Sequence, residues 1–231
     1  MTSMKRISRF TGMRGLVAFG LSELGLLAIP YFIVFRMAAC GGLSPLGTAL
    51  VFYLIWILST LVFLRLLTLL FPLRDGKFSL DCRDRVSLVW TLLGQISFCN
   101  LFPYFSDGIV PPVLKPWFYR ILGSRIGRGI VVLGGRFTDP WLVTLEEGAI
   151  VGDGALILSH LVTSGPTPLI LGSVLLKKNC LIGVRSVILP GVTVGENSLV
   201  QPMSLVKVAT IIPANEIWGG VPAKKLGDRE L

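Results

Sequence analysis

Residues 176–205 read LKKNCL-IGVRSV-ILPGVT-VGENSL-VQPMSL, five consecutive hexapeptides that each begin with an aliphatic residue. Three earlier units have the same form: LEEGAI at Leu145, VGDGAL at Val151 and ILSHLV at Ile157. The first residue is Leu, Ile or Val in all eight units, and the fifth is small in most of them. Two further units begin at Ile126 and Val132, before the phase slips by one residue. Neither a coiled-coil heptad nor the two-residue alternation of ordinary strands explains a spacing of six.

A six-residue period is typical of a three-sided solenoid. Each hexapeptide forms a short strand and a tight corner, so three units close a coil of about eighteen residues. The aliphatic first position points inward and stacks on the same position of neighbouring coils, while the small fifth position fits the corner, where Gly or Asn tolerates the turn. We therefore expect a left-handed parallel β-helix of roughly four to five coils. It should occupy residues 125–212, with a capping segment at 213–231.

The first third of the chain has the composition of membrane-spanning helices. Residues 46–64 carry no charge, and residues 16–35 are apolar except for Ser22 and Glu23. A nineteen-residue helix spans roughly 28 Å, close to the ~30 Å hydrocarbon core of a bilayer. We therefore expect a basic N-terminal segment and a two-helix transmembrane hairpin over 1–72, with a cleaved signal peptide as the competing interpretation of the first run. Glu23 is a functional carboxylate, or it reaches the membrane interface, or it pairs with a neighbouring helix.

Overall composition and charge agree with this division. The 231 residues are 52% hydrophobic and 15% charged, with a mean hydropathy of +0.74, which excludes a disordered chain or an ordinary cytosolic enzyme. The net charge of +9 favours anionic lipid headgroups or a phosphorylated ligand over nucleic acid. Basic residues flank the two apolar runs, whereas the connector between them has only Arg36. The positive-inside rule then predicts a multi-pass protein of a bacterial-type inner membrane, with its C-terminal domain in the cytoplasm.

Residues 73–124 give a weaker signal. The stretch VSLVWTLLGQISFCNLFPYF, which begins at Val86, mixes large apolar and aromatic side chains with Ser, Gln and Asn. It predicts interfacial amphipathic helices and a linker, and a third, re-entrant span is the alternative. The aromatic side chains expected near the headgroups are Trp90, Phe98, Phe102, Tyr104 and Phe105.

The repeats also carry a resemblance to a known family. Residues 179–206, NCLIGVRSVILPGVTVGENSLVQPMSLV, resemble the Asn-x-Trp-Ile-Gly segment and the following coils of the hexapeptide-repeat acyltransferases, such as the galactoside, maltose and xenobiotic acetyltransferases. Residues 212–226, IPANEIWGGVPAKKL, resemble the closing motif of that family. Residues 45–226 more closely resemble the membrane-bound C-terminal acyltransferase-like domains of nonribosomal-peptide-synthetase-like proteins. This resemblance implies an acyl-CoA-dependent O- or N-acyltransferase that forms a homotrimer.

His160 is the candidate catalytic residue. It is the only histidine, and it precedes the one long interruption of the repeat, LVTSGPTPLILGSV at 161–174. The family's catalytic histidine occupies this place, so the resemblance implies a general base that deprotonates the acceptor and then protonates the leaving thiolate. One histidine cannot build the three-histidine zinc site known on this fold, and no metal is expected. The acids nearest in sequence are Glu146, Glu147 and Asp153, and none stands out as the partner of His160.

The resemblance implies a donor site as well. Its expected contacts with CoA are Gly183, Val184, Pro202, Lys207, Trp218, Lys224 and Lys225. Leu181 stands where the family often has Trp, Trp218 could instead cap the solenoid, and each terminal lysine could instead be solvated. The expected function is transfer of an acyl group, with acetyl as the family's usual one, to a hydroxyl or amine of a lipid-linked or membrane-proximal acceptor. The alternative is a non-catalytic trimeric membrane scaffold that retains the solenoid.

Overall fold

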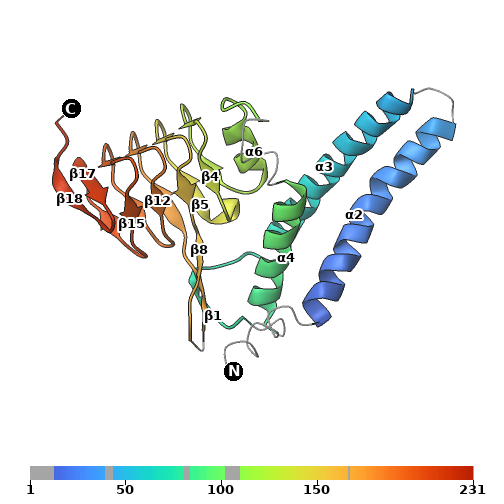
Figure 1. Cartoon of the computed structure of the whole chain (residues 1–231), viewed down its shortest axis with the longest axis horizontal. Coiled ribbons are helices and arrows are strands. Elements are labelled where there is room, and N and C mark those ends of the chain that lie inside the picture. The colour runs from blue at the N-terminus through green and yellow to red at the C-terminus, as the bar shows by residue number, and fades with distance from the viewer. Residues whose placement is uncertain (1–12, 40–43, 81–83, 102–109, 166, 231) are drawn as a thin grey trace. The chain divides into compact units, whose positions relative to one another are not determined.

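The computed structural model describes residues 13–39, 44–80, 84–101, 110–165 and 167–230 (Figure 1). The chain divides into two compact units. Of the described residues, the helical unit contains those from 13 to 72 and from 84 to 101, and the solenoid unit contains those from 73 to 80 and from 110 to 230. This division differs from the expected separate segment at 73–124, because residues 73–80 contribute strand β1 (Gly76–Phe78) to a sheet of the solenoid unit.

Three helices pack on one another in the helical unit: α2 (Met13–Ala39), α3 (Pro45–Leu70) and α4 (Arg85–Asn100). By length and composition, α2 and α3 could each cross a membrane, and both extend beyond the expected runs at 16–35 and 46–64. Their outer faces are apolar: Phe32 on α2 is 65% exposed and Leu54 on α3 is 57% exposed. Ser44 caps α3, since its hydroxyl oxygen accepts the N–H of Gly47 at 3.2 Å.

Helix α4 is covered by protein more fully than an interfacial helix would be. Leu93 and Ile96 are completely buried, and Trp90 is 8% exposed, so these side chains pack against protein. The position of Trp90 near the headgroups stays a prediction. The side chain of Phe98, and residues Phe102, Tyr104 and Phe105, lie outside the described part of the chain.

Glu23 has a partner on a neighbouring helix. Its two carboxylate oxygens accept hydrogen bonds from the Asn100 amide nitrogen at 3.2 and 3.3 Å. The carboxylate of α2 and the amide of α4 therefore satisfy each other within a largely apolar three-helix packing. Of the three roles the sequence allowed for Glu23, pairing with a neighbouring helix is the one seen here.

Three parallel sheets form the sides of the solenoid (Figure 1). The first sheet contains β2 (Arg125–Ile126), β5 (Val143–Leu145), β10 (Val174–Leu176), β13 (Thr193–Val194) and β16 (Ile211–Ile212). The second contains β3 (Val131–Val132), β6 (Ile150–Val151), β11 (Leu181–Ile182), β14 (Leu199–Val200) and β17 (Glu216–Gly220), with β18 (Ala223–Asp228) antiparallel to β17. The third contains β4 (Arg136–Phe137), β7 (Leu156–Ile157), β12 (Val187–Ile188) and β15 (Leu205–Val206).

The hexapeptide positions behave as the repeat predicts. The first residues of all eight units are at most 1% exposed, and the small fifth residues are at most 2% exposed. Ile182 pairs with Val200 on the next coil, eighteen residues later, so the aliphatic side chains stack in columns. At the turns after the first sheet, Asn179, Asn197 and Asn215 adopt left-handed φ values of 54°, 56° and 59°, which asparagine tolerates better than most residues. The expected three-sided parallel β-helix is therefore present.

The interruption after His160 is an ordered hairpin. Strands β8 (His160–Val162) and β9 (Leu169–Leu171) pair antiparallel, and β1 adds to the other edge of β9. In this sheet Gly76, Leu171 and His160 lie in register across the three strands. The Oδ1 atom of Asp75 accepts hydrogen bonds from the Ser173 N–H at 2.8 Å and from its hydroxyl at 2.7 Å. The first strand of this sheet comes from the segment that links α3 to α4, so a segment distant in sequence supports the hairpin that begins at His160.

Candidate active site

His160 forms a short contact with a buried acid. Its Nδ1 atom lies 2.5 Å from Oδ2 of Asp139. The Asp139 side chain is 1% exposed, whereas the imidazole is 28% exposed, so the ring reaches the surface and the carboxylate stands behind it. The Thr138 hydroxyl donates a second hydrogen bond to the same carboxylate oxygen at 3.1 Å. A buried carboxylate with a histidine in front of it is the arrangement that orients a catalytic imidazole.

The stacking of coils explains why two residues twenty-one positions apart meet. Strand β4 of the first coil pairs in parallel with β7 of the second, with Phe137 opposite Ile157. Asp139 follows β4 and His160 follows β7, so both lie at the corner after the third sheet. The sequence had offered Glu146, Glu147 and Asp153 as the nearest acids. Those residues follow strands of the first and second sheets and therefore lie at the other two corners.

An aromatic residue supports the strand that leads to Asp139. Tyr119, on helix α6 (Lys115–Ile121), stacks on Phe137 with ring centroids 4.0 Å apart. Its hydroxyl donates to the Gly135 carbonyl at 3.1 Å and accepts the Phe137 N–H at 3.3 Å. Burial raises the pKa of Tyr119 to about 12, so the phenol stays neutral and serves as a structural contact. After Asp139 the chain enters a short 3-10 turn, η1 (Pro140–Leu142), whose Pro140 carbonyl accepts the Ser124 hydroxyl at 2.6 Å.

The surroundings of His160 change the pKa of its imidazole ring. Burial lowers the pKa of His160, but the hydrogen bond from Nδ1 to Asp139 and the negative charge of that carboxylate outweigh burial, so the net pKa lies above the ordinary 6.5. With Nδ1–H donated to the carboxylate, the Nε2 atom carries the lone pair of the neutral ring. The pair can therefore accept a proton at Nε2 and hold the resulting imidazolium against Asp139.

The residues expected to contact CoA occupy two different corners. Gly183, Val184 and Pro202 follow strands of the second sheet and stack on successive coils. A Cβ atom on Gly183 would lie 2.4 Å from the Pro202 nitrogen, and the Gly183 N–H already donates to the Val200 carbonyl at 2.8 Å. The glycine is thus required by coil packing. Lys207 is exposed and follows the third sheet, so it shares a corner with His160, two coils farther along.

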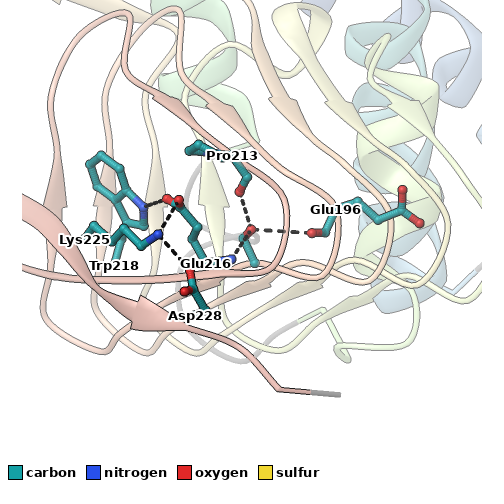
Figure 2. A network of polar contacts seen from close by, with 7 residues as sticks. Glu196, Pro213, Glu216, Trp218, Lys225 and Asp228 are labelled. Carbon is teal, nitrogen blue, oxygen red and sulfur yellow. Dashed lines mark hydrogen bonds and ion pairs between the residues drawn. The ribbon is translucent and has the colours of Figure 1, made fainter.

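The remaining expected contacts lie at the C-terminal cap (Figure 2). The Glu216 carboxylate accepts hydrogen bonds from Trp218 Nε1 at 2.7 Å and from Lys225 Nζ at 2.8 Å. Lys225 also pairs with Asp228 at 2.7 Å, and hydrogen bonds to Asp228 and Glu216 raise its pKa. Two carboxylates therefore surround one ammonium group, and Trp218 is held within the cap. For the exposed Lys224, the described part of the chain provides no hydrogen bond or ion pair to the ammonium group.

The described residues contain no cluster of three or more His, Cys, Asp or Glu side chains that could hold a metal ion. Cys180 is a buried free thiol whose pKa burial raises to about 12, so it is not a nucleophile at neutral pH.

Comparison with known proteins finds relatives that match about half of this chain. The chain is 31% identical over 142 residues to the carnitine operon protein CaiE of Proteus sp., covering 54% of this chain and 71% of CaiE. It is 28% identical over 145 residues to the putative colanic acid biosynthesis acetyltransferase WcaF of Escherichia coli, covering 52% of this chain and 79% of WcaF. A solved hexapeptide-repeat acetyltransferase from Vibrio cholerae, VCA0836 with acetyl coenzyme A, is 22% identical with a TM-score of 0.43, covering 47% of this chain and 62% of that one.

Two further relatives are matched over only part of their length. Delta-poly-L-ornithine synthetase of Acinetobacter baumannii is 29% identical over 139 residues, which are 60% of this chain and 10% of that protein. Gamma carbonic anhydrase 2 of Arabidopsis thaliana is 32% identical over 119 residues, which are 50% of this chain and 42% of that protein. The chain has a single histidine, too few for a three-histidine zinc site. No protein-family profile matches the chain. The repeats, the parallel solenoid and the match over most of CaiE together show that the chain belongs to the hexapeptide-repeat acyltransferase family.

Proposed function

We propose that this protein is a membrane-bound acyltransferase that moves an acyl group, acetyl by family precedent, from acyl-CoA to a hydroxyl or amine of a lipid-linked or membrane-proximal acceptor. The observation that carries the proposal is the contact between His160 and the buried Asp139 at one corner of a solenoid of this family. A buried carboxylate is costly unless it is paired, and His160 is the partner of Asp139. A scaffold without activity would not need this pair.

The reaction follows from the pair's geometry. The Nε2 atom of His160 takes the proton from the acceptor hydroxyl or amine as that group attacks the thioester carbonyl. The imidazolium that forms keeps its Nδ1–H hydrogen bond to Asp139, whose negative charge stabilises it. Collapse of the tetrahedral intermediate breaks the carbon–sulfur bond, and Nε2–H returns the proton to the CoA thiolate. The products are an ester or amide and free CoA, so atoms and charge balance.

The electrostatics of the C-terminal cap indicate different roles for Lys224 and Lys225 in binding acyl-CoA. The charge of Lys225 is offset by Glu216 and Asp228, whereas Lys224 is exposed. We expect Lys224→Ala to raise the KM for acyl-CoA by about tenfold, the value of one charge-assisted hydrogen bond to a phosphate, with little change in kcat. Lys225→Ala should change this KM less. Steady-state kinetics of the two variants give the KM for acyl-CoA. An equal rise in KM for both would contradict the assignment of the phosphate contact to Lys224.

Two features support the membrane and the trimer. The outward faces of α2 and α3 are apolar over lengths that match a bilayer, and water would solvate them poorly. The outward position of each of the five parallel strands in the second sheet is aliphatic, namely Val131, Ile150, Leu181, Leu199 and Ile217. Such a ladder suits an interface between three copies. Leu181→Glu should dissociate the complex in detergent, as measured by sedimentation, and a monomeric wild type would refute the trimer.

The proposed function is tested with alkali-washed membranes that contain the full chain. They are incubated with acetyl-CoA labelled in the acetyl group, and lipid, glycan and protein extracts are counted separately. We expect the label in one extract, at a level above that of membranes without the protein. That extract identifies the acceptor class. Label that follows only the alkali-soluble material would contradict membrane attachment, and a wild-type level equal to background with all extracts and several acyl-CoA donors would favour the scaffold.

A further inference from the structure

Helix α6 has an apolar face that the rest of the described solenoid unit leaves uncovered. Leu114, Trp117 and Ile121 are 45%, 64% and 44% exposed, and Val113, just before the helix, is 77% exposed. Spacings of three and four residues place Leu114, Trp117 and Ile121 on one side of the helix. The opposite side carries Tyr119 and Leu122, which are buried where α6 packs on β2 and β3 of the first coil (Figure 1). The helix therefore has apolar side chains on two opposite sides, one packed on the solenoid and the other exposed.

The surroundings of this face are strongly basic. Residues 110–138 contain Lys115, Arg120, Arg125, Arg128 and Arg136 and no Asp or Glu. Arg120, Arg125 and Arg128 are exposed. The Arg120 guanidinium donates to the carbonyls of Ile126 and Gly127 at 2.7 and 3.1 Å, and the ion pairs found among the described residues involve neither Arg125 nor Arg128. These cations lie in the coil on which α6 packs.

We propose that Val113, Leu114, Trp117 and Ile121, with Arg125 and Arg128 beside them, form a membrane-docking patch that seats the solenoid on an anionic phospholipid surface. Exposed tryptophan and aliphatic side chains enter the interfacial region of a bilayer, where the indole ring is favoured. Arginine side chains next to them meet the lipid phosphates. A second copy of the chain is a poorer occupant, because two such patches brought face to face would place like charges together.

The docking patch has a consequence for the site, and this consequence rests on the proposed function. Asp139 lies on the same first coil, and His160 on the next. Neighbouring strands of a sheet are about 4.8 Å apart. Docking through α6 would therefore hold the catalytic pair within one or two strand spacings of the coil that touches lipid, where an acceptor attached to a lipid would present its hydroxyl or amine.

Photo-crosslinking of the full chain tests the proposal. A benzophenone amino acid replaces Trp117, and two further positions serve as references: Leu54 on the outer face of α3, and Ile211 on the last coil, which is 72% exposed. Each protein is reconstituted in vesicles of phosphatidylcholine alone or mixed with phosphatidylglycerol, and illuminated. Covalent phospholipid is then measured by intact-protein mass spectrometry. We expect lipid on position 117 and on position 54, and not on position 211.

The charge requirement is tested in the same vesicles. Arg125→Gln with Arg128→Gln should lower the lipid label at position 117 by roughly an order of magnitude in the anionic vesicles, and less in phosphatidylcholine alone. The label at position 54 should not change, which controls for folding and insertion.

Each outcome decides one of the two proposals. Lipid at position 54 with position 117 at the level of position 211 would overturn the docking patch and leave membrane insertion intact. Lipid at position 117 without lipid at position 54 would support the patch and count against the spanning helices. A crosslink from position 117 to a second copy of the chain, seen as a doubled mass, would also overturn the patch, as would no lipid at either position.

Discussion

His160→Ala is expected to lower acyl transfer by about 10²–10⁴-fold, the usual contribution of a positioned general base. Asp139 does not replace the imidazole, because its carboxylate stands behind the position of the ring and is 1% exposed. The measurement is the initial rate of labelled acetyl transfer by membranes that contain equal amounts of wild type or variant. Since the loss arises from chemistry, it should appear in kcat, with little change in the KM for acyl-CoA.

Ser159→Ala is the matched control for this experiment. Ser159 is fully buried next to His160, and its hydroxyl oxygen has no hydrogen-bond partner among the described residues. Removing that oxygen perturbs the same turn without removing a functional contact, so the rate should stay close to that of the wild type. If His160→Ala retains the wild-type rate, the proposed base is wrong. If Ser159→Ala loses as much activity as His160→Ala, the effect belongs to the turn.

Asp139→Asn is expected to reduce kcat by roughly 10²-fold or more and to move the acid limb of the pH–rate profile to lower pH. An amide can still contact the ring, but it can donate as well as accept, so it no longer enforces the tautomer with Nδ1–H. The negative charge that stabilises the imidazolium is also lost. Stopped assays of initial rate across the pH range measure both effects.

The direction of the pH shift follows from the pKa of His160. Burial lowers that pKa, and Asp139 raises it above 6.5 in the folded protein. The base must be neutral to act, so wild-type activity rises as the pH increases through this raised pKa. Without the Asp139 charge only the lowering effect of burial remains, and the neutral ring is then present at lower pH. Asp153→Asn, the same change at a different and exposed corner, should leave the profile unmoved. An acid limb that stays in place in Asp139→Asn would contradict the role of this carboxylate.

The same pKa predicts how pH affects the stability of the pair. A histidine whose folded pKa is raised contributes most to stability below its unfolded pKa, and the contribution is lost as the pH rises through the folded value. For His160 that loss begins near 6.5 and ends above it. The optimum for catalysis therefore lies on the alkaline side of the pH at which the His160–Asp139 interaction is strongest.

The solenoid could be predicted from the sequence because its structure is local and periodic. A six-residue period with an aliphatic first position is needed for stacking at every coil, and the eight units satisfied it with side chains that are almost fully buried. Helices α2 and α3 were predictable for a similar reason, since a long apolar run with at most one charge has few alternatives to a helix. His160 was singled out as the one histidine at the one long interruption of the repeat, together with a family resemblance.

The partner of His160 was not predicted, and the reason is geometric. Proximity along the chain pointed to Glu146, Glu147 and Asp153, but in a solenoid the neighbour of a corner residue lies about one coil away. The phase slip after Val132 then hid the correct register, in which Phe137 lies opposite Ile157. Lys225 shows the same limitation: its sequence context suggested a phosphate ligand, and only folding brings Glu216 and Asp228 to its ammonium group.

The sequence was sufficient to predict the period of the repeat, the inward columns of Leu, Ile and Val and the apolar helices, and to single out the one histidine, because each of these depends on spacing or composition within a short stretch. The folded chain was needed to show which carboxylate stands behind His160, that a strand from residues 76–78 supports the hairpin beginning there, and that Trp90 is buried while Trp117 is exposed. Those features depend on contacts between segments far apart in the chain. The alignment of those segments is set by turns and insertions, which a local sequence pattern does not reveal.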